Sequence, residues 1–124
     1  MNSSIEPWLS IREAEQAVEF YKNAFHAKET YRLSDPENGI VVRLKVGEAG
    51  FWVSSDHSSD SGKDEPLGGN SIRMILIVED PSILFQTAIT HGATTIFPIG
   101  EDHGWKLGRI QDPFGLHWEI GHQI

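Results

Sequence analysis

The chain has 124 residues, of which 39% are hydrophobic and 23% charged, and its formal net charge is −8. This length and composition are typical of one globular domain and argue against a wholly disordered chain. An acidic chain repels nucleic-acid phosphates and anionic membranes, so we expect neither as a partner. The sequence contains no cysteine, which excludes disulfides, thiolate metal sites and a cysteine nucleophile.

The sequence carries no signal for export or for a membrane. Residues 1–8 combine neither a basic stretch nor an apolar one, so we expect no signal peptide. No apolar run approaches the roughly 20 residues that a membrane-spanning helix needs. We therefore expect a cytoplasmic location by default.

The first half of the chain predicts one helix and four strands. Apolar residues recur at spacings of three and four over residues 13–25, which predicts a helix. A turn signal, Asp35-Pro36-Glu37-Asn38-Gly39, separates two of the strands. In the first strand Glu6, Trp8 and Ser10 share one face. The four predicted strands are residues 5–11, 29–33, 40–46 and 51–54.

The second half predicts the same order of elements. Asp80 and Pro81 are typical of a helix start, and Gly92 of a helix end. Asp80 follows the first helix start, Glu13, by 67 positions (80 − 13). The run Asp112-Pro113-Phe114-Gly115 matches a type I turn. The predicted strands of this half are residues 72–78, 94–97, 106–111 and 117–121.

This repeated order predicts an α+β fold made of two βαβββ modules. We place the modules at residues 4–55 and 71–122, joined by a polar loop over 56–70, within a single domain of residues 1–124. Duplicated halves usually pair their sheets into one surface. We therefore expect a curved, barrel-like mixed sheet around a cleft for a small molecule.

Several segments resemble one superfamily over nearly the whole chain. They are Phe20-Tyr21-Lys22-Asn23-Ala24-Phe25, Val78-Glu79-Asp80, His91-Gly92-Ala93 and Gly108-Arg109-Ile110-Gln111-Asp112-Pro113-Phe114-Gly115-Leu116-His117-Trp118-Glu119. The sequence resembles the vicinal oxygen chelate superfamily of glyoxalase I, bleomycin resistance proteins and extradiol dioxygenases. The last segment is similar to the PhnB-like branch in particular.

The resemblance implies where a metal ion would bind. In metal-using members four strand residues face the cleft and bind one divalent ion. By position these are Glu6, Trp52, Arg73 and Glu119, and both pairs of equivalent strands keep the spacing of 67. Tryptophan and arginine offer no lone pair to a metal, and a guanidinium about 4 Å away opposes a divalent ion by several kcal/mol. We therefore predict no metal, with a Glu6–Arg73–Glu119 cluster in its place.

Other arrangements of the same residues are open. His117 shares the strand face of Glu119, so with Glu6 these residues could form a shifted site for one divalent metal ion. Trp8 and Trp52 would line the cleft and suit a flat or cationic guest, or would fill it. The alternation leaves Arg109 facing either the cleft or the helix.

We predict a small-molecule-binding protein without a cofactor. It would resemble the bleomycin-resistance type, which sequesters a small, often cationic molecule, and it would form a homodimer. One alternative is a divalent-metal lyase, isomerase or dioxygenase of the same superfamily; another is a filled pocket that leaves only dimerisation. The predicted ligand-binding residues are Glu6, Trp8, Trp52, Arg73, Ile75, His117 and Glu119.

Overall fold

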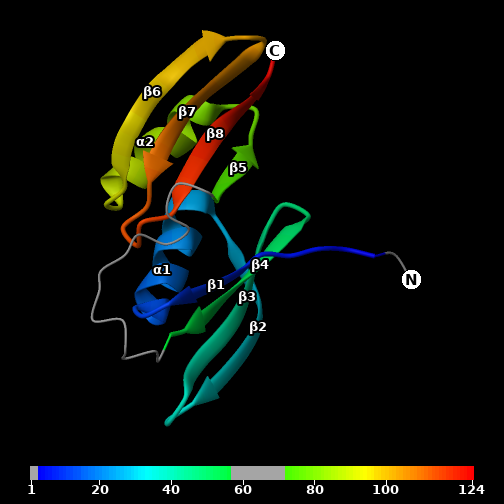
Figure 1. Cartoon of the computed structure of the whole chain (residues 1–124), viewed down its shortest axis with the longest axis vertical. Coiled ribbons are helices and arrows are strands. Elements are labelled where there is room, and N and C mark those ends of the chain that lie inside the picture. Colours follow the sequence, from blue (N-terminus) through cyan, green and yellow to red (C-terminus); the bar gives the residue numbers. More distant parts are fainter. Residues whose placement is uncertain (1–2, 57–71) are drawn as a thin grey trace. The chain divides into compact units, whose positions relative to one another are not determined.

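The computed structural model describes residues 3–56 and 72–124. It contains two compact units, Met1–Gly62 and Lys63–Ile124, and each has one helix and four strands in the predicted order βαβββ (Figure 1). The α+β class and the repeat are therefore confirmed. Apart from Asp56, the loop predicted over 56–70 lies outside the described residues, and the single domain of residues 1–124 stays a prediction. No helix in the described ranges is long and apolar enough to cross a membrane.

The first unit is a mixed four-stranded sheet in the order β1-β4-β3-β2. β1 runs parallel to β4, and the other pairs are antiparallel. The strands are longer than the sequence predicts except β1, where the ladder begins only at Trp8. The elements are β1 (Trp8–Ile11), α1 (Ala14–Phe25), β2 (Lys28–Asp35), β3 (Gly39–Val46) and β4 (Ala49–Ser55).

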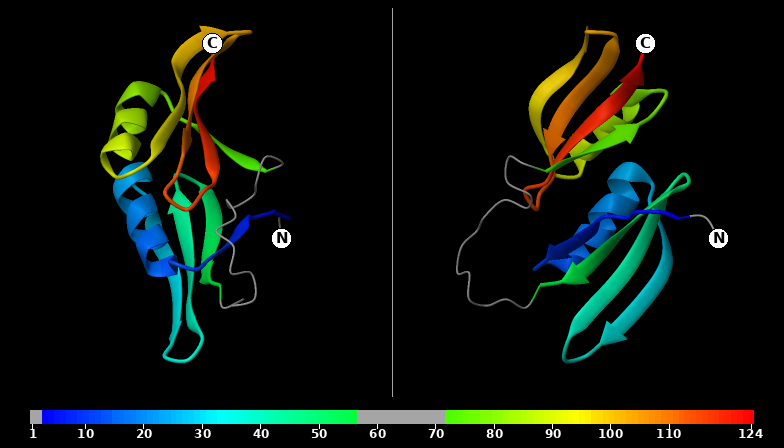
Figure 2. Two further views of the ribbon diagram at one scale, coloured as in Figure 1. Left: turned by 60° about the vertical axis from the view of Figure 1, so that its left-hand side comes forward. Right: turned by 45° about the vertical axis from the view of Figure 1, so that its right-hand side comes forward.

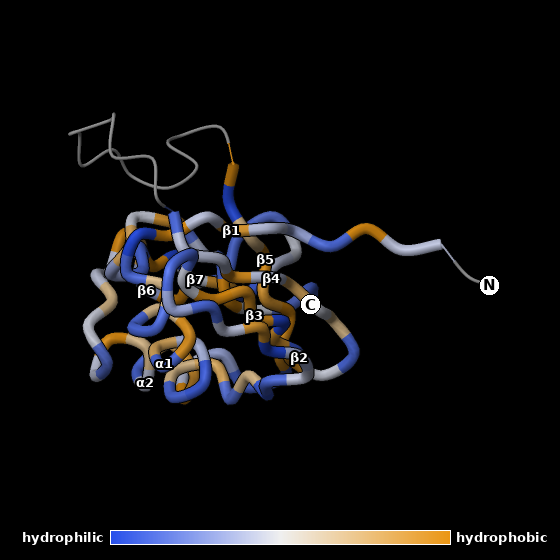
Figure 3. The backbone as a smooth tube through the Cα atoms, turned by 90° about the horizontal axis from the view of Figure 1, so that it is seen from below, coloured by the Kyte–Doolittle hydropathy of each residue, from blue (hydrophilic) through white to orange (hydrophobic). Residues whose placement is uncertain are grey.

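One face of this sheet packs against α1. Val42, Leu44 and Val53 are fully buried on this face, because alternate residues of a strand point the same way. Tyr21 and Phe25 are buried from the helix side. In Figure 3 the backbone beside the β3 label is largely orange, the colour of hydrophobic residues.

The second unit repeats this arrangement, with the sheet order β5-β8-β7-β6 and β5 parallel to β8. Ile110, Trp118 and Ile120 are buried on the helix side, together with Ala88 of the helix. The helix begins at Pro81 as predicted, although the Asp80 side chain makes no capping hydrogen bond. The elements are β5 (Arg73–Ile77), α2 (Pro81–Thr90), β6 (Thr94–Asp102), β7 (Trp105–Gln111) and β8 (His117–Gln123).

Both sheets are open, so the expected barrel-like surface is not a closed barrel within either unit. β1 and β2 are the edges of the first sheet, and β5 and β6 are the edges of the second. β6 extends to Asp102, beyond the predicted residues 94–97, and its register shifts twice between Thr95 and Gly100. Bulges and the proline at position 98 are tolerated there because β6 is an edge strand.

Each sheet has a face that the helix of its own unit does not cover. Figure 2 shows α1 and α2 each lying on one side of its own sheet. The pleat sends every second side chain of a strand to the other side. In the first unit this uncovered face carries Trp8, Arg43 and Trp52, and in the second it carries Arg109 and Glu119.

A buried carboxylate organises the turn between β7 and β8. Asp112 is only 3% exposed. Its Oδ1 accepts the backbone N–H groups of Phe114 at 2.9 Å and Leu116 at 3.0 Å, and its Oδ2 accepts the Trp118 indole N–H at 2.9 Å. The Asp-Pro-Phe-Gly signal is therefore a turn that is also tied into the core.

We expect Asp112→Ala to destabilise the protein by about 3 kcal/mol, because buried donors left without a partner cost roughly 1–3 kcal/mol each. Urea unfolding followed by circular dichroism measures the loss. Asp35→Ala is the matched control: Asp35 also precedes a proline and accepts the Glu37 N–H at 2.9 Å, but on the surface. Equal losses in the two variants would contradict a structural role for the buried carboxylate.

Candidate functional site

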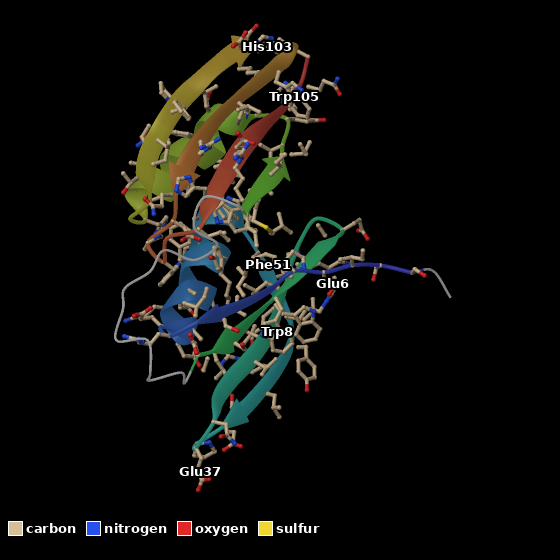
Figure 4. The ribbon with its side chains drawn as sticks, in the orientation of Figure 1. Glu6, Trp8, Glu37, Phe51, His103 and Trp105 are labelled. Atoms are coloured by element: carbon tan, nitrogen blue, oxygen red, sulfur yellow. The ribbon has the colours of Figure 1, made fainter. Side chains whose placement is uncertain are left out.

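A row of aromatic and charged side chains crosses the uncovered face of the first sheet. The strand register places Tyr31 of β2 beside Arg43 of β3, Arg43 beside Trp52 of β4, and Trp52 beside Trp8 of β1. Glu6 lies just before β1 and reaches the same row (Figure 4). The first unit therefore gathers an acid, a base and three aromatic rings on one surface.

Both oxygens of Glu6 are bound within this row. Oε1 accepts Arg43 Nε at 2.9 Å and the Trp52 indole N–H at 2.8 Å, and Oε2 accepts Arg43 Nη2 at 2.5 Å. The guanidinium thus meets the carboxylate as a two-pronged fork, the strongest geometry for such a pair. Hydrogen bonds from Arg43 and then from Trp52 lower the pKa of Glu6 from 4.5 to about 2.

The aromatic rings of the row pack on one another and leave surface exposed. Trp8 stacks on Trp52 with ring centroids 5.6 Å apart and planes 16° from parallel, and Tyr31 meets Trp52 edge-on at 5.6 Å. The Trp8 indole donates to Ser54 Oγ at 2.8 Å. Both indole N–H groups are satisfied, while Trp8 is 54% exposed and Tyr31 48%. A flat molecule could therefore stack on these rings without displacing a hydrogen bond.

The second sheet carries an equivalent row. Phe97 of β6, Arg109 of β7, Glu119 of β8 and Ile75 of β5 are successive neighbours in its register. Arg109 Nη2 lies 3.4 Å from Glu119 Oε1, and the Arg109 guanidinium lies 5.2 Å from the centre of the Phe97 ring. Arg73 Nε lies 3.5 Å from the other oxygen, Oε2. Two arginines therefore flank one carboxylate.

The chain matches the family model of the glyoxalase/bleomycin resistance protein/dioxygenase superfamily over residues 7–120. It belongs to this superfamily. It is also 30% identical to an uncharacterized protein of Mycobacterium bovis, over 98% of this chain and 84% of that one. The expected superfamily is therefore confirmed.

Solved structures share the fold at low sequence identity. The PhnB protein of Bacillus cereus has a TM-score of 0.76 at 16% identity, covering 97% of this chain and 99% of that one. The fosfomycin resistance protein FosX of Listeria monocytogenes has a TM-score of 0.74 at 12% identity, covering 100% of this chain and 95% of that one. These similarities show the fold.

The side chains at the superfamily's metal positions do not fit a divalent ion within either unit. Glu6 is held by Arg43 and Trp52, and Glu119 has two guanidinium groups beside it. Positive charge at that distance opposes a cation. Across residues 3–56 and 72–124, no cluster of three or more histidine, aspartate or glutamate side chains could hold a metal.

Part of the predicted cluster is present in the structure. The Arg73–Glu119 ion pair forms as expected, and Trp8 lies against Trp52. Ile75 and His117 also lie on the uncovered face, since their register partners are Glu119 and Arg73. Glu6 belongs to the other unit, so its expected contact with Arg73 and the shifted metal site stay predictions.

The sequence analysis missed the two other arginine partners. Arg43 binds Glu6, and Arg109 is the second partner of Glu119. The alternation in β3, where Val42 and Leu44 face the helix, already places Arg43 on the uncovered face. Arg109 is fixed there because the next residue, Ile110, is buried against the helix.

The lowered pKa of Glu6 predicts a pH-dependent contribution to stability. Because the folded-state pKa lies below the unfolded value, this contribution is fully present above about pH 4.5 and is lost as the pH falls toward about 2. Glu6→Gln should therefore be less stable than the parent at neutral pH, and the difference should shrink across that range. Urea unfolding at a series of pH values tests this.

Glu48→Gln is the control, because the Glu48 side chain is fully exposed and 3.6 Å from Lys45. It should unfold like the parent at neutral pH. A Glu6→Gln deficit that stayed constant down to about pH 2 would contradict the assigned ion pair.

Proposed function

We propose that this protein is a metal-free, small-molecule-binding member of the superfamily, in its PhnB-like branch, and that its ligand is flat and polar or cationic. The observation that carries the proposal is the exposed aromatic surface of Trp8 and Tyr31 beside a Glu6 carboxylate already bound by Arg43. Exposed aromatic surface is unfavourable in water, so a half-exposed tryptophan stacked on a second one favours a ligand that covers it.

The charge of the ligand follows from the ring faces. Indole and phenol faces attract cations, by roughly 0.5–2 kcal/mol per contact. Glu6 and Arg43 cancel each other, so they neither repel nor strongly attract a charged guest. The net charge of −8 favours approach of a cation over long distances. The ligand would therefore be bound by the ring faces and not by an unpaired carboxylate.

Sequestration accounts for the same features without a reaction. A binding protein needs ring surface and shape, whereas a metal-dependent lyase, isomerase or dioxygenase of this superfamily needs an ion as a Lewis acid. Assembly as a homodimer in the cytoplasm is part of the proposal. A role in resistance to a small toxic molecule would follow from tight binding alone.

The purified protein should contain no stoichiometric divalent metal. We expect elemental analysis to find well under one ion per chain after incubation with nickel, zinc, manganese or iron(II) and gel filtration. The physical reason is that every glutamate oxygen at the metal positions has an arginine neighbour. One tightly held ion per chain would overturn the metal-free proposal and favour the metal-dependent enzymes.

Proflavine, a flat aromatic cation, is a direct probe of the aromatic surface. We expect it to bind the parent protein, and Trp8→Ala to weaken binding about tenfold by removing one stacking partner. Isothermal titration calorimetry measures both affinities. Trp105→Phe, a change to a tryptophan of the other unit, is the control and should bind as the parent does. The proposal fails if proflavine does not bind at millimolar concentration, or if Trp8→Ala binds it unchanged.

A further inference from the structure

The row on the second sheet has more positive than negative charge. Arg73 and Arg109 flank the single carboxylate of Glu119, which leaves an excess of one positive charge in a chain whose net charge is −8. Their contacts with Glu119 are 3.5 and 3.4 Å long, whereas Glu6 and Arg43 meet at 2.5 and 2.9 Å. The two arginines are therefore held loosely by an acid that they share.

Most N–H donors of these two arginines have no acceptor among residues 3–56 and 72–124. A guanidinium carries five N–H groups, and each arginine contacts Glu119 through one nitrogen only. Among the buried side-chain nitrogen and oxygen atoms of the described residues, Arg109 Nε is the one without a hydrogen-bond partner. Such an atom costs free energy unless something supplies an acceptor. Arg43, in contrast, uses all three of its nitrogens on Glu6 and Thr30.

Within the described strands of the second sheet, the register brings no second carboxylate beside this row to remove the excess charge. Asp112 is close in sequence, but it is buried and bound to Trp118 on the helix side of the sheet. The strand register surrounds Arg73 and Arg109 with uncharged or weakly basic side chains. These neighbours are Ile75, Phe97, Gln111 and His117.

From this arrangement we infer that the uncovered face of the second sheet binds the carboxylate of a small organic acid. The carboxylate accepts the free N–H groups of Arg73 and Arg109, the pairing that guanidinium geometry favours most. The apolar part of the acid lies against Phe97 or Ile75, which are 57% and 56% exposed at the two ends of the row. Glu119 is a positioning residue that holds both guanidinium groups.

The charge balance also sets the charge of the ligand. Because Glu119 already cancels one of the two positive charges, one more negative charge neutralises the row. A monocarboxylate is therefore preferred over a dicarboxylate, whose second charge would be unpaired. This inference goes beyond the proposed function, since it shares no residue with the surface of Trp8 and Tyr31 and does not depend on it.

Benzoate is the probe, with benzamide as its neutral isostere and phthalate as its dicarboxylate analogue. We expect benzoate, added to the ¹⁵N-labelled full chain at low salt, to shift amide resonances of β7 and β8. Benzamide should shift none of them, and phthalate should bind more weakly than benzoate. Arg73→Gln, a change to a half-exposed side chain, should weaken benzoate binding about tenfold, the loss expected for one charge-assisted contact.

Arg12→Gln is the matched control, because it removes an exposed arginine of the first unit and should leave the benzoate affinity unchanged. The inference is overturned if benzoate causes no shifts at about 20 mM, if benzamide causes the same shifts, or if Arg73→Gln binds benzoate as the parent does. Proflavine binding reports on Trp8 and benzoate binding on β7 and β8, so either proposal can fail without the other.

Discussion

A single helix covers a single face of each four-stranded sheet, and the rest of the structure depends on that constraint. The strand pleat still sends half of the side chains to the other face. Charges on that half-buried face need partners, since an unpaired charge away from water is costly. In the first unit, Glu6 pairs with Arg43 on this face. In the second unit, Glu119 pairs with Arg73 and Arg109. The arginine of the third strand also lies near an aromatic residue of the second strand in each unit. Arg43 is the register neighbour of Tyr31, and Arg109 lies over the ring of Phe97.

The acid stands at a different place in each unit, and the chemistry of the two surfaces differs as a result. In the first unit Glu6 precedes the first strand, and the last strand supplies Trp52, whose N–H completes the hydrogen bonding of the carboxylate. In the second unit the acid, Glu119, stands on the last strand, and the first strand supplies another arginine, Arg73. One repeat therefore yields a neutral surface with stacked rings, and the other yields an excess of N–H donors.

Local patterns were enough to predict the elements of the fold. The spacing of apolar residues predicted α1, and Asp80 with Pro81 predicted the start of α2. The register between strands was harder to derive. β3 and β4 are joined by two residues, so Arg43 faces Trp52, but β7 and β8 are joined by the longer turn at Asp112. The repeat offset of 67 residues therefore does not hold for the third strand. For this reason the offset could not show that Arg109 occupies the position equivalent to Arg43. β6 extends beyond the predicted end at Phe97, because an edge strand tolerates the proline at position 98.

If the protein is metal-free, as we propose, the arginines take over the neutralisation of the two glutamates that stand at metal positions of the superfamily. In metal-using relatives a divalent ion neutralises the acidic ligands that face the cleft. Here Arg43 neutralises Glu6, and Arg73 with Arg109 neutralises Glu119, from strands of the same sheet. A guanidinium is always charged and cannot dissociate, so the neutralisation does not depend on metal supply or chelators. Unlike a metal ion, an arginine offers no open coordination position at which a substrate oxygen could be polarised. The two proposals accordingly rest on different groups, ring faces in the first unit and N–H donors in the second.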